Sequence, residues 1–161
     1  MNKIISGTTT KMGLAKEKIV QPGAWAIIWC KASRSLLMAK RSSKSNSGGA
    51  WNFFGGRVDS KEDPRDALIR ELSEEAGLSV KAKKLVKIKR LEATKGSARK
   101  KAKSRDLHFY LLTVDKELAP RLNHEHSTFS WFKQDKLPQH FNGPTSLAID
   151  SGVLEKARAR H

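Results

Sequence analysis

Cysteine is almost absent from this chain, since Cys30 is the only one among 161 residues. A single cysteine excludes both an internal disulfide and a zinc site built from four cysteines. Long hydrophobic runs are absent too: the longest, residues 24–30, falls far short of the roughly 18 residues that a membrane span requires. Residues 1–13 lack the apolar core of a signal peptide. These absences predict a soluble protein that works in a reducing, cytoplasmic setting.

Acidic residues are scarce, because 16 Asp and Glu stand against 32 Lys and Arg and leave a formal net charge of +16. The excess is mostly local: residues 81–105 contain twelve basic residues and one acid, Glu92, so this stretch carries +11 and the rest of the chain +5. Such a charge favours polyanionic partners, including nucleotides, RNA and DNA. Within the stretch, residues 95–105 are expected to form a basic loop. Lys100 and Lys101 of this loop are candidate substrate-binding residues, and the alternative is a solvated loop without a ligand.

The order of patterns along the chain predicts strands, a helix, further strands and a final helix. The strands are expected at residues 24–30, 36–39, 51–54, 78–91, 107–114 and 129–132. Asp63 and Pro64 form a helix start and Gly77 a helix stop, while Pro144 opens the last helix. This order predicts an α/β protein with a mixed β-sheet between helices. Residues 21–161 are expected to form one domain, and residues 1–20 fit either a flexible arm or a short edge strand.

Three glutamates share one face of the first predicted helix. Glu71, Glu74 and Glu75 stand at i, i+3 and i+4, within an arc of about 100°. Like charges at this spacing repel, and an oxygen-only cluster suits a hard cation such as Mg²⁺ or Mn²⁺, which also takes substrate phosphates as ligands. Three glutamates alone are more typical of a solvated acidic helix face, so the neighbouring residues decide between the two interpretations.

Those neighbours, GGRVDSKEDPRDALIRELSEEAGL, resemble the signature of the Nudix (MutT-like) hydrolases, G-x(five)-E-x(seven)-R-E-U-x-E-E-x-G-U with U aliphatic. The signature occupies residues 56–78, and all nine specified positions are met, by Gly56, Glu62, Arg70, Glu71, Leu72, Glu74, Glu75, Gly77 and Leu78. The chain departs from the common pattern at Phe54, where many members have proline, and at Arg57, where lysine is frequent. Neither is a specified position.

The resemblance implies an α/β/α sandwich and metal-dependent cleavage of a nucleoside diphosphate linked to another group, by attack of water on phosphorus. It implies Glu74 and Glu75 as the principal metal ligands, with Glu71 a further ligand or the general base, and Gly56 as a ligand through its carbonyl. Arg70 would orient the carboxylates. Glu62 would brace the loop or reach a metal through water.

Residues outside the signature extend the candidate site. The segment from Glu125 to Trp131 resembles a glutamate–histidine pairing of several Nudix subfamilies, which makes Glu125 a candidate fourth metal ligand. His126 is a candidate base or phosphate contact, or an ordinary surface histidine. Arg57, beside the glycine pair, is a candidate phosphate contact. Aromatic residues such as Trp25 fit either a stacking platform for a base or core packing.

Three functions remain open at this point. The first is hydrolysis of a small nucleotide: a canonical or oxidised nucleoside triphosphate, a nucleotide sugar or a dinucleotide. The second is removal of pyrophosphate from RNA 5′ ends, which the basic loop at residues 95–105 favours. The third is a Nudix fold that binds nucleic acid without catalysis. The complete set of glutamates favours an enzyme over the third.

Overall fold

The computed structural model describes residues 20–95 and 103–160. The possible N-terminal arm at residues 1–20 lies almost wholly outside this part of the chain, as do the candidate substrate contacts Lys100 and Lys101. The strands are β1 Gly23–Cys30, β2 Ser35–Arg41, β3 Trp51–Asn52, β4 Phe54–Arg57, β5 Leu85–Lys95, β6 Lys103–Val114 and β7 His126–Lys133. The helices are α1 Pro64–Ala76, α2 Gly143–Asp150 and α3 Val153–Arg158, with short 3₁₀ turns at Ala82–Lys84 and Gln134–Lys136.

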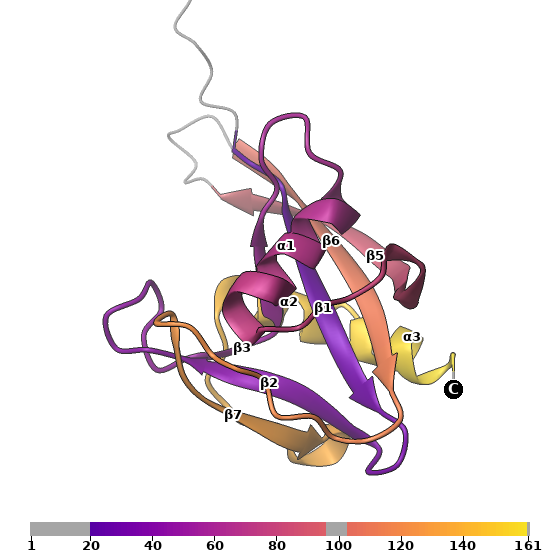
Figure 1. Ribbon diagram of the computed structural model, residues 1–161. Coiled ribbons are helices and arrows are strands. Elements are labelled where there is room, and N and C mark those ends of the chain that lie inside the picture. Colours follow the sequence, from indigo (N-terminus) through magenta and orange to yellow (C-terminus); the bar gives the residue numbers. More distant parts are fainter. Residues whose placement is uncertain (1–19, 96–102, 161) are drawn as a thin grey trace, which may run out of the picture.

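All seven strands belong to one mixed sheet with a central path β3-β2-β1-β6-β5 (Figure 1). β1 runs parallel to β6 and antiparallel to β2 and β4, while β7 pairs with β2. The predicted hairpin of the first two strands is confirmed, with Ile28 opposite Leu37. β1 has hydrogen-bonded neighbours on both edges, and every one of its residues is buried. This explains why its sequence is continuously apolar rather than alternating.

Helices cover both faces of the sheet, as the sequence predicts. α1 packs on one face against Ala24, Ala26 and Ile28 of β1. α2 and α3 pack on the other face, against Trp25 and Ile27, and Figure 1 shows them on the opposite side of the sheet from α1. In the part of the chain that the structure describes, no helix is long and apolar enough to cross a membrane.

The ends of α1 follow the local sequence. Asp63 caps the first turn, because its Oδ1 accepts a hydrogen bond from the Arg65 amide at 2.8 Å, and Pro64 stands at the first helical position. Gly77 ends the helix with φ of 64°, the left-handed conformation that glycine adopts most readily. These caps fix which residues of α1 face β4.

Some predicted boundaries are wrong. Residues 78–84 form a loop and a 3₁₀ turn, and the strand begins only at Leu85. β5 and β6 extend further toward residues 96–102 than predicted, because their polar ends continue the antiparallel ladder and Arg90 pairs with Asp106 across it. Their side chains alternate between solvent and sheet, so composition alone suggested a loop.

The last predicted helix divides in two at Gly152, whose φ is 76°. The predicted strand at residues 51–54 also divides, into β3, which pairs with β2, and β4, which pairs with β1. In both places the two halves of the predicted element contact strands that lie far away in the sequence. Local pattern therefore could not locate either break.

Candidate active site

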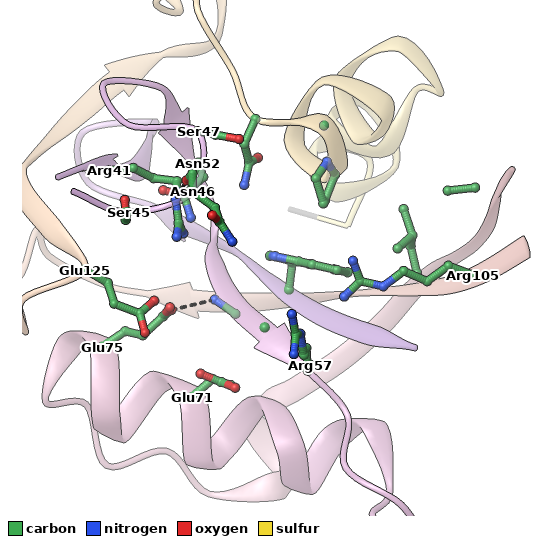
Figure 2. Close-up of a pocket in the computed structure, with 18 of the residues that line it drawn as sticks. Arg41, Ser45, Asn46, Ser47, Asn52, Arg57, Glu71, Glu75, Arg105 and Glu125 are labelled. Atoms are coloured by element: carbon green, nitrogen blue, oxygen red, sulfur yellow. Dashed lines mark hydrogen bonds between the residues drawn. The ribbon is translucent and has the colours of Figure 1, made fainter. Parts of the chain in front are cut away.

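A cleft of about 1450 Å³ lies between α1, β4, the loop that follows β2, and the start of α2. Carboxylates of α1 and of the segment before β7 lie at one end of it, Arg105 of β6 lies at the other, and Arg57 of β4 lies between them (Figure 2). This cleft brings together residues from most of the length of the described chain.

Two consecutive glycines of β4 allow α1 to approach the sheet. Gly55 has φ of 141°, and a Cβ there would lie 2.1 Å from the Ala24 carbonyl oxygen. A Cβ at Gly56 would lie 2.7 Å from Glu71 Oε1. Any side chain at either position would meet backbone or carboxylate, so the glycines are required for the carboxylates of α1 to lie against the β4 backbone.

Glu75 is the most deeply placed carboxylate of the cleft. It is only 3% exposed, and its Oε2 accepts a hydrogen bond from the Gly55 amide at 2.9 Å (Figure 2). Burial raises the pKa of Glu75 to about 9, against the opposing effect of the Gly55 hydrogen bond, and the charges of Glu71 and Glu125 act in the same direction as burial. A buried carboxylate in negative surroundings is a position where a cation would be stabilised.

Arg70 connects three parts of the site. Its Nε and Nη2 bind the two oxygens of Glu62 at 3.1 and 3.0 Å, and its Nη1 lies 3.0 Å from Glu71 Oε1. Its Nη2 also donates to the Arg57 carbonyl. The hydrogen bond from Arg70 lowers the pKa of Glu62, while burial raises that of Glu71 in spite of Arg70. Arg70 therefore lies closer to Glu62 and Glu71, at 3.0 Å from each, than to Glu74, at 3.7 Å.

The three predicted helix carboxylates do not all enter the cleft. Glu71 and Glu75, one helical turn apart, line it. The Glu74 side chain is 57% exposed and lies 3.7 Å from Arg70 Nη1. Glu74 is therefore on the same helix face but at its solvent side, where a change of side-chain rotamer would be needed to join the other two.

Glu125 reaches the same point from a distant segment. Its side chain lines the cleft beside Glu75, and Figure 2 shows both carboxylates together. The backbone there is held by a hydrogen bond from the Ser42 amide to the Glu125 carbonyl at 2.8 Å. The structure thus brings Glu125 to the place expected of a fourth ligand, and its role in binding metal stays a prediction.

His126 lies in the interior instead. It is 5% exposed, its Nε2 is 3.1 Å from Asn52 Oδ1, and its ring meets Phe54 edge to face. Burial lowers the pKa of His126 to about 4, so it is neutral at pH 7. The interpretation as a surface histidine is wrong, and the structure does not bring the ring to the cleft as a phosphate contact or base.

The arginines of the cleft include one residue that the sequence predicted and one that it placed in a loop. Arg57 lines the cleft, as expected of a phosphate contact. Arg105 lies in β6 and lines the same cleft, stacked on Trp25. The signal for Arg105 was present in the alternation of Arg105, Leu107 and Phe109, which places all three on one face of a strand. Trp25 is 4% exposed and serves both as core and as part of the cleft wall.

Comparison with known proteins identifies the family to which this chain belongs. The model of the NUDIX domain matches residues 20–148, most of the chain. The chain belongs to the NUDIX domain family. It is a Nudix-type hydrolase, and members of this family act on phosphoanhydride bonds of nucleotide derivatives.

Similar proteins agree with the family in sequence and in fold. The CTP pyrophosphohydrolase of Escherichia coli is 28% identical over 129 residues, which cover 78% of this chain and 86% of that protein. The 8-oxo-dGTP diphosphatase of Proteus vulgaris is 43% identical over 51 residues, which cover 32% of this chain and 46% of that protein. A MutT NUDIX hydrolase of Burkholderia pseudomallei superposes with a TM-score of 0.65 at 24% identity, covering 81% of this chain and 95% of its own. That likeness supports the fold.

Nudix hydrolases generally use a divalent metal, and the donors of this cleft fit one. All of them are oxygens, from Glu71, Glu75, Glu125 and the Gly56 backbone, which suits Mg²⁺ or Mn²⁺. The missing Cβ at Gly56 leaves its backbone open toward Glu71. Among the described residues no three acidic, histidine or cysteine side chains already stand as finished ligands. A cation bound by these residues would therefore require the carboxylates to move, and it would compete with Arg70 for Glu71.

Proposed function

We propose that this Nudix hydrolase cleaves nucleoside triphosphates to a nucleoside monophosphate and pyrophosphate, by attack of water on phosphorus in the presence of Mg²⁺ or Mn²⁺. The observation that carries the proposal is the order of charges along the cleft: Glu71, Glu75 and Glu125 lie together at one end, Arg105 lies at the other, and Arg57 lies between them. A chain of phosphates with divalent cations is the ligand whose charges match this order. The names of the two bacterial relatives, a CTP pyrophosphohydrolase and an 8-oxo-dGTP diphosphatase, support the same substrate class.

Each residue of the cleft has a distinct role in the proposed reaction. Glu75, Glu125 and the Gly56 carbonyl would hold a cation, and Glu74, whose side chain is 57% exposed outside the cleft, would join them after a change of rotamer. The cation would supply positive charge beside the phosphates and make water more acidic. Glu71 is either a further ligand or the acceptor of the proton from water, and its burial, which raises its pKa, suits the second role. Arg70 keeps Glu71 in place, and Glu62 keeps Arg70 in place. Arg57 binds a phosphate.

One feature of the sequence favours a second substrate, a triphosphate at an RNA 5′ end. The +11 charge of residues 81–105 suits an RNA backbone. It also attracts free nucleotides, so the nucleoside triphosphate is preferred here. A Nudix fold that binds RNA without catalysis is the third alternative.

The proposal is tested by measuring hydrolysis of a panel of substrates in the presence of Mg²⁺ or Mn²⁺, with EDTA as the control. The panel contains canonical and oxidised nucleoside triphosphates, a nucleotide sugar, a dinucleoside polyphosphate and triphosphate-ended RNA. Phosphate is measured after added pyrophosphatase, and products are separated, because some cleavages release neither pyrophosphate nor phosphate. EDTA-sensitive turnover of nucleoside triphosphates is expected. Turnover of RNA alone would favour the second function, and no turnover of any substrate by the folded protein would favour the third.

A further inference from the structure

The position of Arg105 depends on a missing side chain at Gly23. Arg105 lies on β6 two residues before Leu107, and Leu107 pairs with Gly23 of β1. A Cβ at Gly23 would lie 2.1 Å from the Trp25 ring and 2.8 Å from Arg105 Nη2. With no side chain there, the Arg105 guanidinium lies over Trp25, with 5.3 Å between Cζ and the ring centroid. The stacked pair forms the end of the cleft that is remote from the carboxylates.

Within residues 20–95 and 103–160, the buried Nε of Arg105 has no hydrogen-bond acceptor. Burial lowers the pKa of Arg105, and the neighbouring Arg57, another cation, lowers it further. A guanidinium keeps its charge at neutral pH and needs acceptors for its N–H groups. Because the Nε is buried, a ligand in the cleft would be bound by the terminal guanidinium nitrogens, which Figure 2 shows pointing into the cleft.

The surroundings of Arg105 suit a heterocycle better than a phosphate. Leu107 and Ala93 lie beside it in the cleft wall, and Pro144 and Leu147 of α2 belong to the same cleft. Figure 2 shows Arg105 across the cleft from Glu71, Glu75 and Glu125, with Arg57 between them. A nucleotide whose phosphates lie near the carboxylates and Arg57 extends its other end, the base, toward Arg105.

On the basis of the proposed nucleotide hydrolysis, we infer that Arg105 is a specificity-determining residue that binds the base and selects cytosine or guanine. The guanidinium is planar, offers parallel N–H donors and has no acceptor. Cytosine presents O2 and N3, and guanine O6 and N7, as two adjacent acceptors. Uracil has N3–H between its two carbonyl oxygens, adenine has its 6-amino group beside N1 and N7, and 8-oxoguanine carries a hydrogen on N7. Arg105 therefore disfavours those three bases.

The inference is tested by binding, without turnover. The affinities of CMP, GMP, UMP and AMP are measured by calorimetry in EDTA, for the wild type and for Arg105→Gln and Arg105→Lys. The wild type is expected to bind CMP and GMP about tenfold more tightly than UMP and AMP, which corresponds to about 1.4 kcal/mol. Both variants are expected to bind all four within about twofold of one another, because lysine keeps the charge but loses the planar pair of donors.

Two further variants separate base recognition from general effects. Arg57→Gln should weaken all four nucleotides and keep their ratios, because Arg57 faces the phosphates. Arg160→Gln, at an exposed arginine near the C-terminus, should match the wild type. Circular dichroism confirms that each variant is folded.

Three results would overturn the inference. Equal weakening of all four nucleotides in Arg105→Gln, with recovery in Arg105→Lys, would show that Arg105 contacts phosphate. Unchanged affinities in both variants would remove Arg105 from the binding site, and a wild type without base preference would remove the selection. Because hydrolysis is not measured, a wild type that selects bases but fails to hydrolyse triphosphates would overturn only the proposed function.

Discussion

At the scale of single residues, the Arg70 side chain makes hydrogen bonds to three other residues of the site. It binds both oxygens of Glu62, one oxygen of Glu71 and the carbonyl of Arg57. A lysine has one compact ammonium group and cannot serve these partners together. Arg70 thus positions the carboxylate that lies nearest to Gly56.

We expect Arg70→Lys to lower kcat/KM by about 10- to 100-fold, the usual cost of losing a residue that orients a metal ligand. The measurement is the dependence of turnover on Mg²⁺ concentration, with Arg160→Lys as the matched control. If Arg70→Lys keeps the wild-type Mg²⁺ dependence, Arg70 does not position the ligands.

A substitution at Glu74 tests whether this exposed residue is a metal ligand. Because its side chain is 57% exposed, Glu74→Gln should leave the free energy of unfolding within about 0.5 kcal/mol of the wild type. As a proposed metal ligand, the same variant should lose turnover by orders of magnitude. Steady-state kinetics and urea unfolding measure the two effects, and near-wild-type turnover would contradict the assignment.

Glu75 predicts a pH dependence of stability. Its pKa is raised from 4.5 to about 9 in the folded protein. Between these values the folded protein keeps a proton that the unfolded chain releases. This contribution to stability is therefore fully present below pH 4.5 and is lost as pH rises toward 9. Without metal, the Tm of the wild type should therefore fall relative to the Tm of Glu75→Gln as pH rises from 5 to 9.

The measurement for Glu75 is thermal unfolding in EDTA at several pH values, with Glu155→Gln at an exposed position as the control. A constant Tm difference between wild type and Glu75→Gln would show that Glu75 does not carry the raised pKa. Turnover with Mg²⁺ should fall by orders of magnitude in Glu75→Gln, because the amide loses the negative charge that a cation requires.

At the scale of elements, α1 is the part of the fold that fixes the site. Its start is set by Asp63, its end by Gly77, and its approach to β4 by Gly55 and Gly56. Each of these features depends on a single residue type with a known conformational role. A shift of α1 by one residue would rotate Glu71 and Glu75 by about 100° away from the cleft.

The cap of α1 gives a prediction of stability. Asp63→Ala removes the acceptor for the Arg65 amide and should lower the free energy of unfolding by about 1 kcal/mol. Urea unfolding measures this, with Asp115→Ala as the control, because the Asp115 side chain is 87% exposed. An effect at Asp63 no larger than that at Asp115 would mean that the cap contributes little.

At the scale of the whole molecule, the charge is distributed unevenly in a way that affects substrate capture. The basic stretch at residues 81–105 and the arginines of the cleft attract anions, and salt screens such attraction within about 8 Å at physiological ionic strength. This field acts on the rate of encounter and not on the chemistry of cleavage.

Replacing Arg99, Lys100, Lys101 and Lys103 with Ser should therefore lower kcat/KM for nucleoside triphosphates at low ionic strength. The difference from the wild type should disappear near 0.5 M salt, where attraction is screened. Kinetics across a salt series measure this. Equal salt dependence in the two proteins would remove this segment from substrate capture, and loss confined to triphosphate-ended RNA would favour the RNA function.

The sequence by itself determined the family, the helix that carries Glu71, Glu74 and Glu75, and the order of most strands. These depend on spacing and on local conformational preferences, which a chain shows without its fold. Only the tertiary structure decided which side chains meet: Glu125 beside Glu75, Arg105 over Trp25, and His126 in the core. Each of those contacts joins strands, loops or helices far apart in the chain, and they form because burying the two faces of the sheet brings these segments together.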